Sequence, residues 1–277
     1  MPVNDVEVAR RGSGVPIECD VSICTVVGGQ LKTVARMLNS VLSTADPVSI
    51  EIIVANTAGP SSGSDVFARD FPDVKFFDLA GVSPVQAKNH AIRLAKGRFV
   101  GLFDYDLVVA EGCLKTLVDY MDDHPDIGVA GPRVVDAYGT LERTARAFHS
   151  IFSFLGQSAG GGLLPAMLWR PKHYIEDWNH RSTREVDWLC GGAHLVRREL
   201  VEDIGLLADH LPFFYEQEYY LRSKKGGWHN FYVYEAQVVH PNPDRYGGIS
   251  GAPTSKCFSA LEALRFFYGK WFSPKMN

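Results

Sequence analysis

The sequence lacks the features that mark membrane-spanning, secreted, disordered or fibrous proteins. No stretch reaches the roughly 18 consecutive apolar residues that a membrane-spanning helix needs. The first 18 residues carry acidic and basic side chains and no apolar run, so we expect neither a signal peptide nor an anchor there. Hydrophobic residues make up 46% and charged residues 22% of the 277 residues, which is typical of a folded soluble protein.

The sequence also lacks a cysteine framework and a basic excess. Its five cysteines include no Cys-x-x-Cys pair, which argues against disulfides and structural zinc and favours a reducing cytoplasm. They are scattered along the chain at Cys19, Cys24, Cys113, Cys190 and Cys257. With 28 Lys and Arg against 32 Asp and Glu, the formal net charge is −4, so we expect no nucleic-acid partner.

What the sequence does contain is an alternation of strand and helix patterns. β-Branched apolar runs predict buried strands, and apolar residues at 3.6-residue spacing predict helices between them. Strand, helix and strand in succession imply parallel pairing, hence an α/β fold with a mostly parallel central sheet flanked by helices. We expect strands over 21–27, 51–56, 74–79, 98–103, 186–189, 193–196 and 230–239. We expect helices over 31–42, 111–123, 198–204, 215–225 and 255–272. A further helix is expected to begin at Pro84, after an N-cap at Ser83, and to stop at Gly97.

A pair of carboxylates follows one of these strand patterns. Asp104 and Asp106 come directly after 98–103, with Tyr105 between them. In open parallel sheets, ligands bind beyond the carboxyl ends of the strands. Two carboxylates so close in the chain can approach one divalent cation, which would neutralise a diphosphate and stabilise it as a leaving group. A solvated turn is the competing interpretation of such a triplet taken alone.

Other short segments put this triplet in context. They are, in order, Val21–Ile23, Glu51–Asn56, Lys88–Ile92, Gly97–Val100, Asp104–Asp106, Gly191–Arg198, and Glu216 with Leu221–Arg222. Their succession resembles glycosyltransferase family 2, and within it the rhamnosyltransferase-like bacterial members that build cell-surface polysaccharides. The resemblance implies a GT-A fold with a Rossmann-like sheet, a nucleotide-diphosphate-sugar donor held through Mn²⁺ or Mg²⁺, and inversion at the anomeric carbon by direct displacement.

The resemblance also predicts how the chain is organised. It implies a flexible segment 1–18, a GT-A domain 19–245 and a C-terminal helical extension 246–277. The domain would divide into a nucleotide-sugar half (19–135) and an acceptor half (136–245). The aromatic and basic residues of the extension fit a membrane surface near a lipid-linked acceptor, packing on the domain, or a homodimer contact.

On the donor side, the resemblance assigns roles to individual residues. Asp104 and Asp106 match the family's metal and donor motif, which also includes Tyr105. His240, at the end of the last strand pattern, matches a histidine that helps to bind the metal or the diphosphate. Lys88 stands where the family commonly has Arg and would pair with a donor phosphate, whereas an exposed helix face is the simpler interpretation.

Glu216 occupies the position of the family's catalytic base. A carboxylate is needed there to take the proton of the acceptor hydroxyl as that hydroxyl attacks the anomeric carbon. Glu218 is the competing candidate, and because two helical residues point about 200° apart, both cannot face one pocket. Leu221 and Arg222 favour the register with Glu216 as base, and Glu218 also fits a solvated acid in the first turn of a helix.

Four residues are candidates for contact with the sugar and the acceptor. Gly191 and Gly192 would let the backbone pass close to both substrates, although a tight turn explains them as well. Asp187 and Trp188 match an acid–Trp pair of the family, in which Trp188 would offer a stacking face to a sugar ring. A buried core residue is the alternative for that tryptophan.

The chain also departs from the family pattern on the nucleotide side. At Ala55 the family usually carries an Asp that contacts the base or ribose, and Asn56 and Asp78 are the candidates to replace it. The run Thr25–Gly28 lacks the aromatic ring of the family's Thr-Tyr-Asn. These losses fit either an unusual donor or a protein that has lost catalysis.

The favoured function is an inverting, metal-dependent glycosyltransferase that acts on a glycan, a lipid-linked or a protein-linked acceptor, in the cytoplasm or at the inner face of the membrane. A catalytically silent nucleotide-sugar-binding or scaffold protein is the main alternative. A nucleotidyltransferase would need a basic glycine-rich loop after the first strand, of which Gly28–Lys32 is a poor version. No Gly-x-Gly-x-x-Gly follows any strand pattern, which disfavours a dinucleotide oxidoreductase.

Overall fold

The computed structural model describes residues 16–44, 47–60, 63–148, 170–211 and 215–241. Most of the segment 1–18 and the whole extension 246–277 lie outside these ranges, so the predictions about them remain untested. None of the helices within the ranges is long and apolar enough to cross a bilayer.

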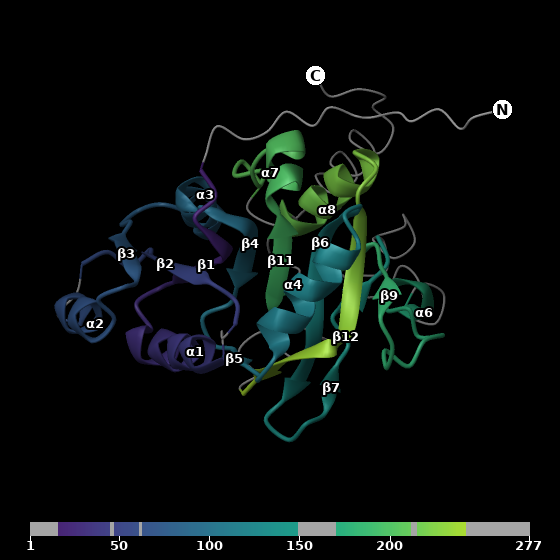
Figure 1. The fold of residues 1–277 in the computed structure, drawn as a ribbon, viewed down its shortest axis with the longest axis horizontal. Coiled ribbons are helices and arrows are strands. Elements are labelled where there is room, and N and C mark those ends of the chain that lie inside the picture. The colour runs from purple at the N-terminus through teal and green to yellow at the C-terminus, as the bar shows by residue number, and fades with distance from the viewer. Residues whose placement is uncertain (1–15, 45–46, 61–62, 149–169, 212–214, 242–277) are drawn as a thin grey trace, which may run out of the picture.

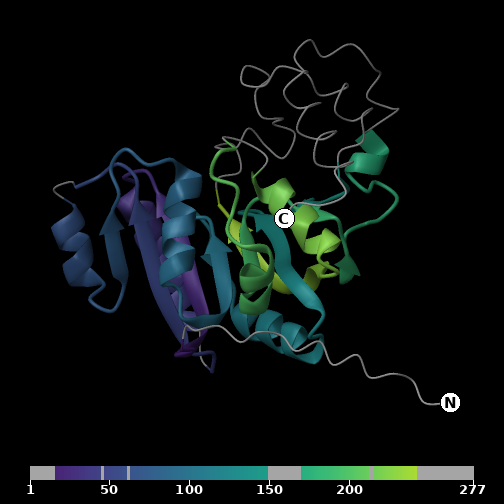
Figure 2. The ribbon, with the colours of Figure 1, turned by 90° about the horizontal axis from the view of Figure 1, so that it is seen from above.

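Within these ranges the chain forms a ten-stranded sheet with helices on both faces (Figures 1 and 2). The elements are β1 (Cys19–Val27), α1 (Leu31–Thr44), β2 (Ile50–Asn56), α2 (Ser64–Asp70), β3 (Lys75–Asp78), α3 (Pro84–Leu94), β4 (Gly97–Phe103), β5 (Val108–Val109), α4 (Cys113–Asp123), β6 (Ile127–Asp136), β7 (Leu141–Glu142), β8 (Ala145–Arg146), α6 (Arg170–His173), β9 (Arg184–Glu185), β10 (Trp188–Leu189), β11 (Ala193–Arg197), α7 (Arg198–Ile204), α8 (Tyr215–Lys225) and β12 (His229–His240). The strand order is β3-β2-β1-β4-β11-β6-β12-β5, with β7 beside β6 and β9 beside β12.

The first half of the sheet is parallel, as predicted. β1 pairs in parallel with β2 on one side and with β4 on the other, and β2 pairs in parallel with β3. In the second half β6 and β12 are also parallel, but β11 runs antiparallel to both β4 and β6. Because of that reversal, the carboxyl end of β4 lies beside the start of β11, which brings two distant parts of the chain together.

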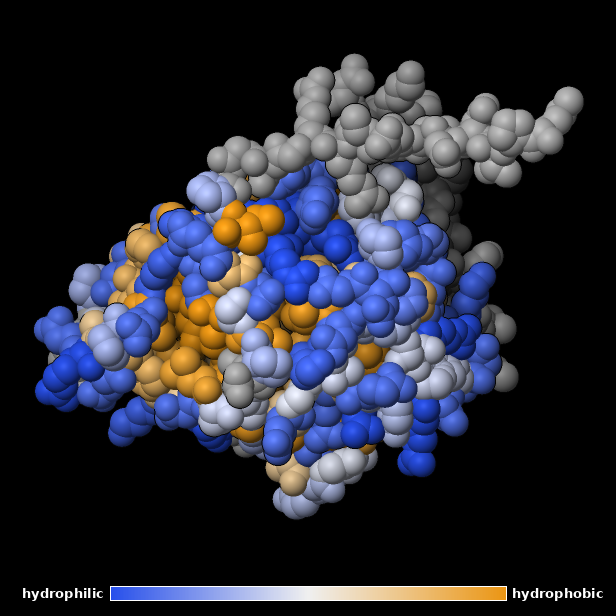
Figure 3. Space-filling view, viewed as in Figure 1, coloured by the Kyte–Doolittle hydropathy of each residue, from blue (hydrophilic) through white to orange (hydrophobic). Residues whose placement is uncertain are grey.

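The two faces of the sheet have separate hydrophobic layers. On one face α1 and α4 bury residues such as Leu38 and Leu117, and on the other α3, α7 and α8 bury residues such as Leu200. The predicted apolar face of α1 is confirmed, except that Leu42 is 51% exposed. Figure 3 shows the face that carries α1 and α4, with hydrophobic residues gathered on its left and polar residues on its right.

The start of α3 follows the predicted capping chemistry. Ser83 Oγ accepts a hydrogen bond from the Gln86 backbone N–H, the Gln86 side chain accepts one from Ser83, and Pro84 is the first helical residue. The predicted stop at Gly97 is wrong, because the helix ends three residues earlier. Gly97 instead opens β4, where an added Cβ would lie 2.5 Å from the Ser22 nitrogen.

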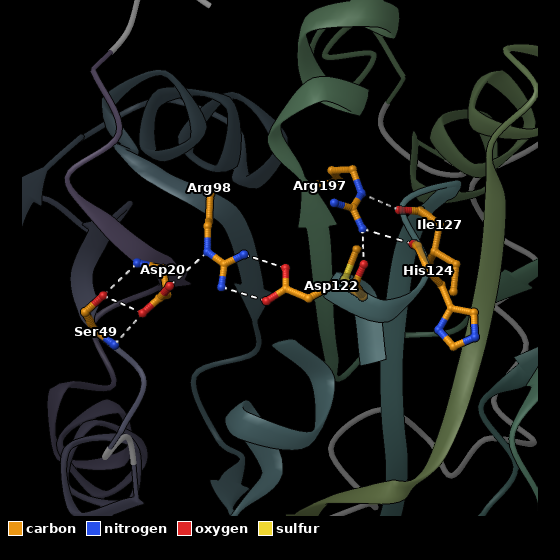
Figure 4. A network of polar contacts seen from close by, with 8 residues as sticks. Asp20, Ser49, Arg98, Asp122, His124, Ile127 and Arg197 are labelled. Atoms are coloured by element: carbon orange, nitrogen blue, oxygen red, sulfur yellow. Dashed lines mark hydrogen bonds and ion pairs between the residues drawn. The ribbon is translucent and has the colours of Figure 1, made fainter. Parts of the chain in front are cut away.

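A buried arginine ties β11 to the end of α4, at the sheet edge opposite the carboxyl end of β4. The Arg197 Nε donates to the carbonyl oxygen of Ile127 at 2.8 Å, and its Nη2 donates to the carbonyl oxygens of Met121 and of His124, the latter at 3.2 Å (Figure 4). Only 8% of Arg197 is exposed. The carbonyl groups of Met121 and His124 are among those that the end of α4 leaves without intrahelical donors, and Ile127 is the first residue of β6.

A second arginine near this edge is more exposed. Arg98 joins Asp20 of β1, at 2.8 Å, to Asp122 of α4, at 2.5 and 2.8 Å (Figure 4). Asp20 also accepts a hydrogen bond from the Ser49 hydroxyl at 2.6 Å. The Arg98 side chain is 36% exposed, so water competes with these ion pairs and weakens them.

Candidate functional site

The first acid of the Asp-Tyr-Asp triplet is held by the backbone at the start of β11. Asp104 Oδ2 accepts a hydrogen bond from the Gly192 N–H at 2.9 Å, and the Asp104 N–H donates to the Gly192 carbonyl at 2.8 Å. Burial raises the pKa of Asp104 above its ordinary value; Lys88 opposes this rise, and Glu216 adds to it. These electrostatic effects mean that Asp104 shares one site with Lys88 and Glu216.

The second acid, Asp106, is buried without hydrogen-bond donors. It is 2% exposed, and neither of its carboxylate oxygens accepts a hydrogen bond from the described residues. The Nε2 of His240 lies 3.8 Å from its Oδ2. Burying a carboxylate is costly unless a positive charge or donors compensate it. Asp106 therefore has the environment of a group that binds a cation.

His240 lies between two carboxylates at the end of β12. Its Nδ1 is 3.3 and 3.5 Å from the two oxygens of Glu142, on the side away from Asp106. The contacts with Asp106 and Glu142 outweigh desolvation and raise the pKa of His240 to about 10. Sequence reasoning missed Glu142, because only the pairing of β7 with β6 brings it to this edge.

Glu216 lies in the first turn of α8 and forms an ion pair with Lys88 of α3. The distance from Lys88 Nζ to Glu216 Oε1 is 2.9 Å, and the two side chains are 16% and 24% exposed. Burial alone would raise the pKa of Glu216, but Lys88, His194 and the Gly191 backbone outweigh burial, and the pKa lies below its ordinary value. Glu216 is therefore ionised at neutral pH.

The turn Gly191–Gly192 contacts both Asp104 and Glu216. Both residues have positive φ angles, +60° and +85°, which L side chains rarely adopt. Gly192 donates its N–H to Asp104, and the Gly191 backbone stabilises the charged form of Glu216. The glycines predicted to lie near the sugar are thus needed for the backbone conformation that contacts both acids.

Glu218 points away from the Lys88–Glu216 pair, as expected for two residues that are two positions apart in a helix. Its side chain is 1% exposed, and both of its oxygens lie 2.9 Å from the Nε of Arg222. Arg222 also donates to the carbonyl oxygens of Leu206, at 2.7 Å, and Ile204. Glu218 is therefore part of a buried ion pair that anchors α8, rather than a solvated acid of the first turn.

One histidine near the site was not singled out by the sequence analysis. His194 of β11 is 5% exposed, and its ring stands edge-on to Tyr220 with the centroids 5.5 Å apart. Burial lowers its pKa to about 4, although Glu216 acts in the opposite direction. His194 is therefore neutral at neutral pH. His194 lies within the segment Gly191–Arg198 that carries part of the family resemblance, but only the two glycines of that segment were assigned a role.

On the nucleotide side, Asn56 holds Asp78. The Asn56 Nδ2 donates to Asp78 Oδ1 at 2.6 Å and to the Gly59 carbonyl at 2.8 Å, and the Asn56 side chain is buried. Ala55 is fully buried. Asp78 is only half-buried at the end of β3, so it is the more exposed of the two candidates. Tyr105 is half-buried against the first hydrophobic layer.

The two predicted acceptor residues before this turn make packing contacts. Asp187 accepts hydrogen bonds from the Phe148 N–H at 2.9 Å and from Lys224 Nζ at 2.6 Å. Trp188 is 6% exposed, and its Nε1 donates to the Ala147 carbonyl at 3.2 Å. Its indole therefore packs in the core of the described chain, which favours the interpretation of Trp188 as a buried core residue over that of a stacking face for a sugar.

Comparisons with known proteins agree with this architecture. A family model described as Glycosyl transferase family 2 matches residues 22–205. The chain belongs to glycosyltransferase family 2. No curated protein sequence matches it.

Solved structures of other proteins show that this family 2 chain has the GT-A fold. S. aureus TarS 1–349 matches with a TM-score of 0.53 at 14% identity, over 82% of this chain and 62% of that one. Its complex with UDP-GlcNAc matches with a TM-score of 0.58 at 14% identity, over 93% and 68%. GalNAc-T7 with UDP, GalNAc and Mn²⁺ matches with a TM-score of 0.63 at 17% identity, over 90% and 48%. The chain thus spans about three fifths of the TarS fragment in the first of these matches.

The acids of this family 2 chain fit a divalent cation that arrives with its substrate. In the parts of the chain that the structure describes, no three His, Cys, Asp or Glu side chains are arranged as a complete metal site. Mg²⁺ commonly takes one or two carboxylates and completes its shell with water and substrate phosphates. The unsatisfied carboxylate of Asp106, close to Asp104 and His240, suits that incomplete type of site.

Proposed function

We propose that this chain is an inverting, metal-dependent glycosyltransferase. It would move a sugar from a nucleotide diphosphate to a hydroxyl of a glycan or glycoconjugate, in the assembly of bacterial surface polysaccharide. The observation that carries the proposal is that Asp104 and Glu216 meet at one glycine turn, while Asp106, two residues after Asp104, lies 3.8 Å from His240. A lipid-linked or protein-linked acceptor, a cytoplasmic location, and membrane or homodimer contact through 246–277 belong to the same proposal.

On the donor side, Asp104 and Asp106 would hold the cation, with His240 assisting. When bound, Mn²⁺ or Mg²⁺ neutralises the diphosphate and so makes it a better leaving group. Asp78, held by Asn56, would contact the nucleotide in place of the acid missing at Ala55. Lys88 would add a positive charge for the donor phosphates, since it lies within the electrostatic reach of Asp104.

On the acceptor side, Glu216 would act as the general base. The acceptor oxygen forms a bond to the anomeric carbon while the bond from that carbon to the diphosphate oxygen breaks. The hydroxyl proton passes to Glu216, whose lowered pKa keeps it ionised and ready to accept it. Attack from the side opposite the diphosphate inverts the anomeric configuration.

Calorimetric titration with UDP, GDP and dTDP, each with and without Mn²⁺, tests the donor site. We expect one nucleotide to bind in a metal-dependent manner, and the Asp104→Ala/Asp106→Ala double variant to lose that binding. Asp119→Asn is a control, because it removes a carboxylate paired with Lys115 on the exposed side of α4. If a folded protein binds none of the nucleotides, the catalytically silent alternative gains support.

The pH dependence of transfer tests the pairing of Lys88 with Glu216. Without Lys88, burial dominates, and the pKa of Glu216 should rise. Since Glu216 must be ionised to act, Lys88→Met should move the acidic limb of the kcat/KM profile to higher pH, by about 1–3 units. Arg93→Met, on the exposed side of α3, should leave the profile unchanged. An unshifted acidic limb in Lys88→Met would contradict the pairing.

A further inference from the structure

Glu142 is a partly buried carboxylate that no motif of the sequence singled out. Its side chain is 12% exposed and lies 98 positions before His240 in the chain. Its oxygens are 3.3 and 3.5 Å from His240 Nδ1. On the other side of the ring, Nε2 is 3.8 Å from Asp106 Oδ2. One nitrogen of the imidazole thus faces Glu142, and the other faces Asp106 of the candidate metal site.

The register of the sheet explains why these side chains meet. Glu142 of β7 pairs with Val134 of β6, and Val134 also pairs with Val238 of β12. Residues directly opposite one another in a sheet share a face, and so do residues two apart in a strand. His240, two residues beyond Val238, therefore lies on the same face as Glu142, one strand away across β6.

The hairpin that carries Glu142 is held by its own turn. Asp136 Oδ1 accepts hydrogen bonds from the N–H groups of Tyr138 and Thr140, both at 2.8 Å, and the Asp136 N–H donates to the Thr140 carbonyl at 2.9 Å. Asp136 also pairs with His240 across the sheet. The short strand β7 is therefore fixed relative to the histidine.

We propose that Glu142 is a positioning residue that directs the Nε2 of His240 toward the cation held at Asp106. Without a metal, His240 is protonated on both ring nitrogens, and a cation held at Asp106 would take the place of the Nε2 proton, which leaves to solvent. A carboxylate that accepts the remaining Nδ1 proton fixes the orientation of the ring and makes Nε2 a stronger ligand. Loss of such a partner typically weakens metal affinity by about 10–100-fold. This inference rests on the proposed function, because it requires a metal at Asp106.

The chain offers a matched control on the same strand. At the start of β12, His229 Nδ1 lies 3.0 Å from Glu185, so a second Glu–His pair is present at the far end of this strand. Those two side chains are 44% and 46% exposed, and none of the proposed metal or base residues touches them. Glu185→Ala removes a comparable contact without approaching Asp106.

The test is Mn²⁺ binding to the full-length protein, followed by electron paramagnetic resonance. The intensity of the signal from free Mn²⁺ gives the fraction bound and hence the affinity. The modulation of the signal of bound Mn²⁺ by a ¹⁴N nucleus reports an imidazole ligand. We expect Glu142→Ala to weaken Mn²⁺ binding by about 10–100-fold and to reduce the ¹⁴N signal. Glu142→Gln, which keeps the size and a hydrogen-bond acceptor, should lie between the wild type and Glu142→Ala, and Glu185→Ala should match the wild type.

The outcomes separate this inference from the proposed function. If the wild type binds Mn²⁺ with a ¹⁴N signal and Glu142→Ala, shown to be folded, does the same with equal affinity, the positioning role is overturned while the metal site stands. If the wild type binds no Mn²⁺ with or without nucleotide, the metal-dependent function fails, and the inference fails with it. If wild-type binding lacks the ¹⁴N signal, His240 is not a ligand and the inference is overturned.

Discussion

Replacing Glu216 with Gln is expected to lower kcat for sugar transfer by about 10²–10⁴-fold, while donor binding stays close to that of the wild type. The amide keeps the shape of the side chain and can still accept hydrogen bonds from Lys88 and the Gly191 backbone. It cannot take the proton of the acceptor hydroxyl at neutral pH. The measurement is kcat with a saturating donor, together with calorimetric titration of the nucleotide.

Glu218→Gln is the matched comparison, because it makes the same chemical change two residues away. Glu218 forms an ion pair with Arg222, so we expect this variant to lose stability and to keep kcat near that of the wild type. Normal transfer by Glu216→Gln combined with loss of transfer in Glu218→Gln would show that the base has been assigned to the wrong residue.

The largest expected loss of stability comes from Arg197→Met. Methionine preserves much of the apolar stem but leaves the carbonyl groups of Met121, His124 and Ile127 without this donor. An unsatisfied buried acceptor costs about 1–3 kcal/mol, so we expect the free energy of unfolding to fall by about 3 kcal/mol. Urea denaturation of the wild type and of Arg197→Met measures the difference, provided that the free energy of unfolding depends on urea concentration with the same slope in both proteins.

Arg98→Met is the control for that prediction (Figure 4). It removes ion pairs with Asp20 and Asp122 from a side chain that is 36% exposed, and exposed ion pairs contribute about 0–1 kcal/mol. Equal losses in the two variants would mean that the bonds of Arg197 to carbonyl groups are no stronger than surface ion pairs.

Part of the candidate site could be predicted because local sequence patterns determine it. The apolar strand pattern before Asp104 locates that acid at the end of a strand, and helical geometry alone separates Glu216 from Glu218. Arg222, four residues after Glu218, was available as a signal for the buried ion pair. Sequence reasoning used that arginine only to fix the register.

The remaining features depend on contacts that sequence periodicity does not encode. Glu142 reaches His240 through a strand of two residues, which is too short to leave a pattern. The close approach of Ser22 that requires glycine at Gly97 comes from strand pairing, so a helix stop was predicted there instead. The burial of Trp188 likewise depends on β8, which is also only two residues long.

The link between Asp104 and Glu216 runs through the main chain of Gly191 and Gly192. The main chain of this turn therefore helps to set the spacing between Asp104 and Glu216, together with the Lys88–Glu216 ion pair and the Glu218–Arg222 ion pair that anchors α8. Because this contact uses backbone atoms, substitutions at neighbouring positions can change the side chains around Asp104 and Glu216 without removing the main-chain contact that the two acids share.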